Sequence, residues 1–200
     1  MWVAGVCAAT HGTVLVPTMD ALQQQLVFIA GSVLCAGIGS VHDVRERRIP
    51  NRVTGPAMVA GLVLHTVLGG WHGLGDSALA GLIAGGIFLV FFLAGGMGAG
   101  DVKLMAAVGC IAGTAHLPLV VISTALAGAV FALAVSVARG RLRETLRNVG
   151  ELLLHHGRVG LKPHDELNLN NARTLRLPFA LPIATGCLIT LCSVAWEARP

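Results

Sequence analysis

Two aspartates are candidates for chemistry because each interrupts an apolar sequence in a way that membrane topology alone does not require. Asp43 follows the apolar stretch 21–42, and Asp101 follows Gly98-Ala99-Gly100 between two apolar stretches. A carboxylate beside a bilayer is costly, so it is a functional candidate by default. Two neighbouring carboxylates cannot both ionise cheaply, so one acts as a general acid and the other as a general base. The pair predicts an aspartyl protease that needs neither a metal nor a covalent nucleophile.

The composition predicts the elements that must position these acids. The chain has 200 residues, 54% hydrophobic and 12% charged, with a mean hydropathy of +0.76, whereas a soluble domain carries about 25% charged residues. Each segment without Asp, Glu, Lys or Arg is long enough to cross a hydrocarbon core of ~30 Å. Their apolar runs are continuous rather than alternating, which favours helices over a barrel. We expect an all-α, polytopic membrane protein. These segments are 21–42, 53–75, 77–100, 104–138 and 177–196.

About six transmembrane helices are expected, because the segment 104–138 is too long for one ordinary crossing. The residues from Gly113 to Pro118 have the turn chemistry that would divide it. The fourth helix would then span only ~22 Å, so either it extends at one end or its Asp101 end lies below the membrane surface. The expected helices are 21–42, 53–70, 77–95, 102–116, 118–138 and 178–196.

The distribution of basic residues predicts the orientation. Of the 14 Lys and Arg residues, all but two lie in 43–52 and 139–176, and the positive-inside rule places both segments in the cytoplasm. Both termini would then lie outside, and the segment 96–101 would lie inside. Asp43 and Asp101 would share the cytoplasmic face, where the first and fourth helices could bring them together. The net charge of +4 is therefore a topology signal and does not indicate nucleic acid.

We expect a single membrane-embedded domain over 21–198, with a cytoplasmic loop at 139–176. Residues 1–20 lack the basic region of a signal peptide and are treated as an uncertain N-terminal tail, for which Met19 is an alternative start to Met1. The five cysteines form no CxxC pair, which leaves a zinc ribbon unsupported.

Structural explanations for the acidic residues must be weighed as well. Asp101 after a glycine could be an ordinary helix cap. Asp43 would end a helix where the macrodipole disfavours an anion, so its structural explanation is an ion pair with Arg45, Arg47 or Arg48. The glycine-rich segment 95–100 could admit an extended substrate or simply allow close helix packing.

Two motifs together resemble the prepilin peptidase (type IV leader peptidase) family. They are Asp43-Val44-Arg45-Glu46-Arg47-Arg48-Ile49-Pro50-Asn51 and Gly98-Ala99-Gly100-Asp101-Val102-Lys103. The resemblance covers roughly residues 25–195. The segment 177–184 resembles the family's last helix, and we assign it no catalytic role.

The resemblance implies a GxGD-type intramembrane aspartyl protease at the cytoplasmic face of the bacterial inner membrane. Such enzymes remove the basic leader from type IV prepilins or pseudopilins without a cofactor. Asp43 and Asp101 would be the catalytic pair. Site-shaping roles would fall to Gly98, Gly100, Lys103, Pro50 and Asn51. The four arginines in 43–52 are expected to set topology and contact anionic lipid, with recognition of an acidic pilin residue as a weaker alternative.

One departure from the family pattern affects the expected activity. Bifunctional members carry an N-terminal domain with paired CxxC motifs that methylates the new terminus, and the sequence has no such motif. The resemblance is therefore to the short form associated with Flp/Tad-type pili, and methyl transfer is not implied.

Two non-enzyme alternatives stay open. A small proton-coupled transporter could use the same aspartates, but transporters place their acids near the midplane and often show internal repeats. A scaffold subunit of a secretion apparatus would tolerate loss of either acid. The serine and metal protease motifs Gly-x-Ser-Gly and His-Glu-x-x-His are absent from the sequence.

Overall fold

The chain folds into an all-helical bundle in the computed structural model, which describes residues 21–143, 145, 147–151 and 178–197. Its helices are α1 (Ala21–Glu46), α2 (Asn51–Leu93), α3 (Ala99–Ala138) and α5 (Ala180–Glu197). All four are long and apolar enough to cross a membrane, and the described residues contain no strand. The prediction of an all-α membrane protein is confirmed. The expected tail 1–20 and most of the expected loop 139–176 lie outside the described residues.

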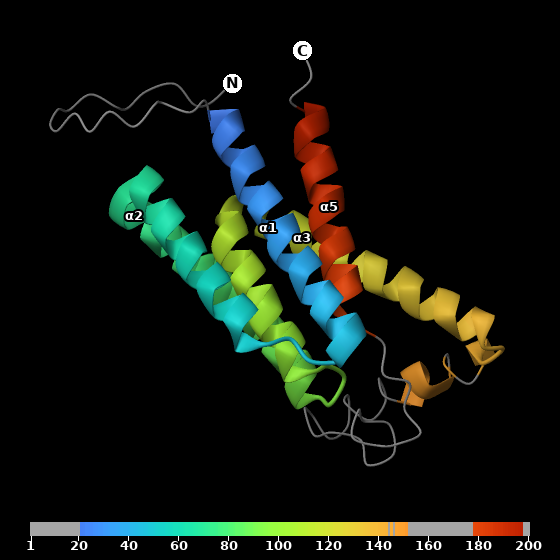
Figure 1. Cartoon of the computed structure of the whole chain (residues 1–200). Helices are drawn as coiled ribbons and strands as arrows, with labels where there is room; N and C mark the ends of the chain where they lie inside the picture. Colours follow the sequence, from blue (N-terminus) through green and yellow to red (C-terminus); the bar gives the residue numbers. More distant parts are fainter. Residues whose placement is uncertain (1–20, 144, 146, 152–177, 198–200) are drawn as a thin grey trace, which may run out of the picture.

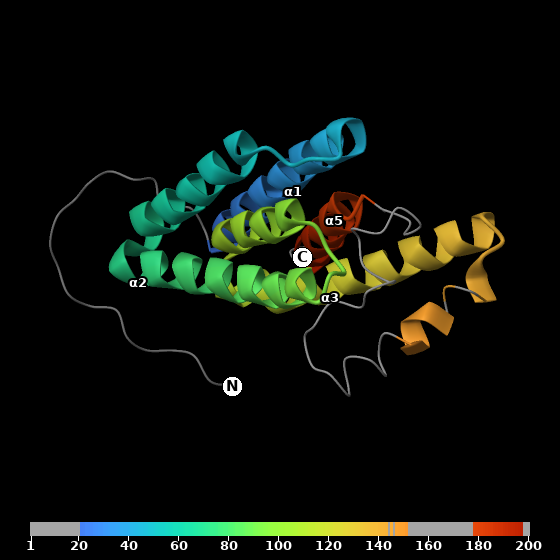
Figure 2. The same cartoon turned by 90° about the horizontal axis from the view of Figure 1, so that it is seen from below.

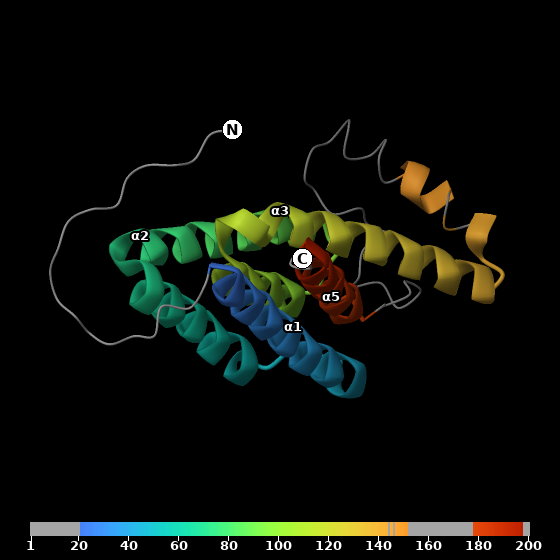
Figure 3. The ribbon, with the colours of Figure 1, turned by 90° about the horizontal axis from the view of Figure 1, so that it is seen from above.

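Two glycines break the longest helices. Gly70 in α2 has φ 59° and ψ −144°, and Gly113 in α3 has φ 73° and ψ 171°; only glycine adopts these conformations readily. The two breaks divide α1, α2, α3 and α5 into six helical segments, which follow the predicted order, and the described residues of 142–151 are helical as well. Figures 2 and 3 show α2 turning back on itself, with two arms that spread apart from the turn as a V.

Several expected boundaries are wrong. The segment 71–76, expected as a loop, is helical and directly follows Gly70. The fourth segment begins at Ala99 and ends before Gly113, and Pro118 lies inside the helix that follows. At each break the chain changes direction at one glycine with positive φ, whereas we expected turns of several residues. The fourth segment is thus short, about 21 Å from its residue count and rise.

Side chains of α2 satisfy the backbone groups that the break in α3 leaves unpaired. The hydroxyl of Ser77 donates to the carbonyl of Cys110 at 2.6 Å, and Nε2 of His65 lies 3.0 Å from the carbonyl of Ile111. On the other side of the break, the backbone N–H of Thr114 donates to Asp76 at 3.1 Å. Broken helices persist at membrane depth only where such partners exist.

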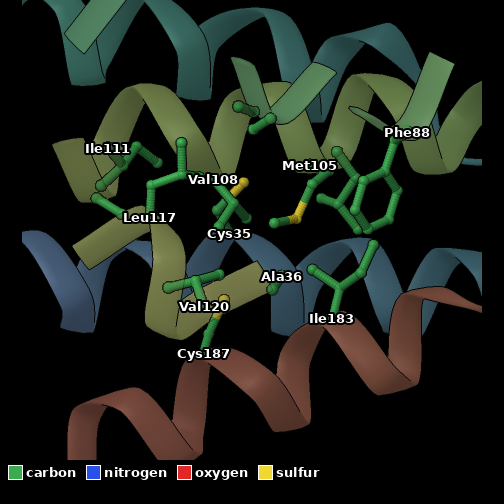
Figure 4. Close-up of a cluster of buried hydrophobic side chains, with 14 of the residues drawn as sticks. Cys35, Ala36, Phe88, Met105, Val108, Ile111, Leu117, Val120, Ile183 and Cys187 are labelled. Carbon is green, nitrogen blue, oxygen red and sulfur yellow. The ribbon is translucent and has the colours of Figure 1, made fainter. Parts of the chain in front are cut away.

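Buried side chains from all four helices form one core. Phe88 of α2, Met105 of α3 and Ile183 of α5 meet there beside Ala36 of α1, and Figure 4 shows them converging between the helices. Large apolar side chains also cover the outer surface: Leu82 is 74% exposed and Val130 67%. A soluble protein rarely exposes contiguous apolar area of this kind, which fits a lipid-facing surface.

The helix arrangement brings four chain segments to one end of the bundle. Figure 1 shows the last turn of α1 beside the first turns of α2, α3 and α5. Helix α1 packs against both α3 and α5. Both candidate acids belong to these turns, because Asp43 lies near the end of α1 and Asp101 near the start of α3.

Candidate active site

Asp43 lies in the last turn of α1, three residues before the helix ends. The helix ends at Glu46, and Arg47 follows in the left-handed region with φ 51°. The backbone N–H of Arg47 donates to the carbonyl of Asp43 at 2.9 Å. The Asp43 carboxylate accepts a hydrogen bond of 3.4 Å from the backbone N–H of Ala180, the first residue of α5. Two helices therefore hold this acid.

Asp101 is the third residue of α3 and caps it. Gly98 is the N-cap residue, with an extended backbone, and its N–H donates to Oδ2 of Asp101 at 3.3 Å. This is one half of a capping box. Asp101 is therefore not the N-cap that the alternative explanation expected, but it does satisfy the N–H of that residue. The Asp101 side chain is also buried, with 9% of the residue exposed. A capping role does not require burial, so capping alone does not explain why Asp101 is buried.

Both acids line one open pocket of about 300 Å³. They come from different helices, Asp43 from α1 and Asp101 from α3. The pocket therefore brings together the two residues that the sequence singled out. The other lining residues are Arg47, Arg48, Ile49, Gly98, Ala99, Gly100 and Lys103.

The remaining predicted site residues join the two motifs. Nζ of Lys103 donates to Oδ1 of Asn51 at 3.0 Å, which connects the start of α3 to the start of α2. Pro50 is the N-cap of α2, with φ −72° and ψ 143°. Gly98 and Gly100 line the pocket, whereas Pro50 and Asn51 support it from outside the lining.

Glycine at position 100 has a steric reason. A Cβ atom there would lie 3.2 Å from Cβ of Ile49 and 3.4 Å from its Cγ1, closer than most such contacts in proteins. The absent side chain therefore keeps the α1–α2 connection close to the first turn of α3. Ile49 and Gly100 thus form one wall of the pocket beside Asp101.

The sequence analysis missed two contributions to this site. The segment 177–184 was assigned no catalytic role, yet its Ala180 binds Asp43. Arg47 and Arg48 were expected to set topology and contact lipid, yet both line the pocket. A backbone N–H leaves no residue-type signal, so only the fold could reveal the first. A basic residue next to a catalytic candidate could have revealed the second.

The arrangement suits general acid–base hydrolysis. Asp43 and Asp101 line one pocket of about 300 Å³, which is large enough to hold water. One carboxylate can activate water while the other, protonated, donates to the leaving amine. Within the described residues, no group of three or more His, Cys, Asp or Glu side chains is placed to hold a metal ion. Reaction without a metal stays a prediction.

Comparison with known proteins identifies a family and several relatives. Residues 28–133 match the type IV leader peptidase family. A prepilin leader peptidase/N-methyltransferase of Aeromonas salmonicida (strain A449) is 30% identical over 162 residues, which cover 70% of this chain and 55% of the relative. A protein of the same name from Burkholderia pseudomallei (strain 1026b) is 37% identical over 125 residues, covering 58% of this chain and 40% of the relative. The chain spans about half the length of these curated relatives. No solved structure matches it.

Proposed function

Because this chain belongs to the type IV leader peptidase family, we propose that it is a membrane aspartic endopeptidase that removes leader peptides from type IV prepilins. The observation that carries the proposal is the shared pocket, in which Asp43 of α1 and Asp101 of α3 face one space. Asp43 and Asp101 are its catalytic pair, one as the base that activates water and the other as the acid.

The substrate must reach this pocket as an extended strand. A peptide bond inside a helix is shielded by its own hydrogen bonds, whereas the pocket wall formed by Gly98, Ala99 and Gly100 has no side chain larger than a methyl group. Cleavage of a leader just before an apolar helix would place the cut bond at the bundle end and the apolar helix in lipid. The exposed apolar surface of the bundle supports this arrangement.

Further details of the activity rest on sequence signals. The basic residues around Arg45 to Arg52 support a pocket at the cytoplasmic face, and we place the protein in the bacterial inner membrane. By its resemblance to the short form of the family, we propose prepilins of the Flp/Tad type as substrates. The methyltransferase activity in the relatives' names is not proposed for this chain. The position of both acids at helix ends disfavours a transporter, which would hold them near the midplane.

Co-expression with candidate prepilins tests the proposal. The wild-type chain should shorten a prepilin by its leader, while Asp43→Asn and Asp101→Asn should each reduce cleavage by at least about a thousandfold, because each removes one member of the acid–base pair. Membrane levels of the variants should match wild type. Normal cleavage by either well-expressed variant would refute the two-carboxylate mechanism.

A further inference from the structure

The start of α5 is fastened to α1 by two side chains that lie three residues apart. The Ser40 hydroxyl lies 2.7 Å from the carbonyl oxygen of Ala180, and the Asp43 carboxylate accepts from the N–H of the same residue at 3.4 Å. Residues three apart on a helix share a face. Both polar groups of one backbone unit in α5 are therefore engaged by one face of α1.

The contact between Ser40 and Ala180 is not needed to pair a free backbone group at a helix end. The Ala180 carbonyl already belongs to a helix, and the Ser40 hydroxyl has a second acceptor 2.8 Å away at the carbonyl of Ala36. The arrangement is also dry, since Ala180 is fully buried and Ser40 is 5% exposed. The hydroxyl has one proton for two carbonyls, and only its contact with Ala180 joins the two helices. That contact is lost if α5 slides along α1, so it sets where α5 begins.

The same contact supplies electrostatic support that α1 cannot give Asp43. The acid lies at the C-terminal end of α1, where the macrodipole is unfavourable for an anion. The N-terminus of α5 has the opposite polarity, and its free N–H groups favour a carboxylate. Docking α5 therefore compensates for the position of Asp43 on its own helix.

We propose that Ser40 and the backbone of Ala180 form a clamp that holds the Asp43 carboxylate in the pocket, and that Ser40 is a positioning residue for the reaction. This inference rests on the proposed peptidase function. The clamp acts through geometry: Ser40 sets where α5 begins relative to α1, and Ala180 then sets where the carboxylate points. The segment 177–184 thereby contributes to the site without donating a side chain to it.

Ser40→Ala tests the clamp against a matched control. Ser32→Ala removes a buried hydroxyl from the same helix that bonds only the carbonyl four residues back, that of Phe28. Ser40→Ala should lower kcat for leader cleavage by about tenfold with little change in KM, since small misplacement of a catalytic group slows chemistry. Ser32→Ala should leave kcat near wild type, and Ser40→Thr, which keeps the hydroxyl, should restore most of the rate. Equal kcat in Ser40→Ala and Ser32→Ala would overturn the proposal.

A second pair of variants removes the other half of the clamp. Ala180→Pro deletes the N–H that Asp43 accepts, at the first helical position, where proline suits the backbone. Ala180→Gly keeps that N–H. We expect kcat to fall at least tenfold in Ala180→Pro and less than threefold in Ala180→Gly. Equal rates would show that the N–H is not needed.

Amide exchange gives a result that does not depend on cleavage. In protein labelled with ¹⁵N-alanine, the Ala180 resonance is assigned by its loss in Ala180→Gly. Its exchange should accelerate several-fold in both Ser40→Ala and Asp43→Asn, but not in Ser32→Ala. Unchanged exchange would overturn the clamp even if the peptidase function holds. Failure of the wild-type chain to cleave any prepilin, with exchange as expected, would refute the function and leave the clamp standing.

Discussion

Arg47 ends α1 in a conformation that usually belongs to glycine. Helices commonly stop with a glycine in the left-handed region, and a side chain there costs about 1–2 kcal/mol. Here the residue has φ 51° and is one of those that line the pocket. Strain of this kind concentrates at functional sites. A role at the pocket therefore explains why position 47 is an arginine, whereas the turn alone would favour glycine.

Arg47→Gly should therefore stabilise the protein while weakening its function. We expect a gain of about 0.5–1 kcal/mol, from relief of strain less the entropy cost of glycine, seen as a higher Tm in detergent. Arg48→Gly is the control, because residue 48 is not in the left-handed region and should gain nothing. A lower Tm for Arg47→Gly than for Arg48→Gly would contradict this account.

Position 100 is predicted to tolerate no branched side chain. Gly100→Val would push against Ile49, which already lies 3.2 Å from the place of a Cβ atom, and would narrow the pocket beside Asp101. Leader cleavage should fall at least about tenfold, since small displacement of a catalytic group is costly. Gly96→Val is the matched control in the same segment, where the nearest atom is an ordinary 3.6 Å away. Near-normal turnover of Gly100→Val would reject the role of this wall.

At the scale of helices, the breaks in α2 and α3 look alike in the sequence but differ in their surroundings. A Cβ at Gly70 would meet nothing within 4 Å, whereas one at Gly113 would lie 2.7 Å from Oδ2 of Asp76 and 2.9 Å from Cε1 of His65. Gly70 is needed only for the backbone conformation of the turn. Gly113 also admits the side chains that satisfy the broken helix.

This difference predicts unequal costs for the same substitution. Gly70→Ala should cost about 1–3 kcal/mol, the strain of its backbone alone. Gly113→Ala should cost more than about 3 kcal/mol, because it also displaces Asp76 and leaves the Thr114 N–H unpaired. Thermal unfolding of both variants in the same detergent measures the gap. Equal losses would mean that the cluster around Asp76 contributes little.

The elements were predictable where composition governs them and less so where single contacts do. Apolar runs without charge predicted all six helical segments, because crossing a bilayer demands them. The prediction of a loop at residues 71–76 was wrong. Asp76 was taken as a loop residue, but it lies in a helix and accepts a hydrogen bond from Thr114. A polar residue that repairs a distant helix break cannot be told from a loop residue without tertiary contacts.

At the scale of the whole molecule, the orientation in the membrane can be measured. We expect the pocket end inside and the turn at Gly70 outside. Trp71, next to that turn, is 85% exposed, and Arg52 lies in the first turn of α2 at the pocket end. In a background with Cys7→Ser and Cys192→Ala, an impermeant maleimide should label Trp71→Cys from outside and Arg52→Cys only after lysis. The reverse pattern would place the pocket on the wrong side.

The candidate site was predictable in its residues but not in its assembly. The spacing of Asp43 and Asp101 across a helical round trip indicated one membrane face, and the pocket contains both. No feature of the sequence indicated that Lys103 bonds Asn51 or that α5 supports Asp43. Side-chain motifs mark residues that do chemistry, whereas the contacts that orient them use backbone atoms and ordinary serines.

The dependence of Asp43 on α5 has a consequence for biosynthesis. Asp43 and Asp101 leave the ribosome well before Ala180 does, so a nascent chain holds both acids while α5 is still being translated. Until that segment threads into the bilayer, the first acid has no donor from α5 and faces only the unfavourable end of its own helix. The proposed peptidase would therefore stay inactive until α5 has inserted beside α1.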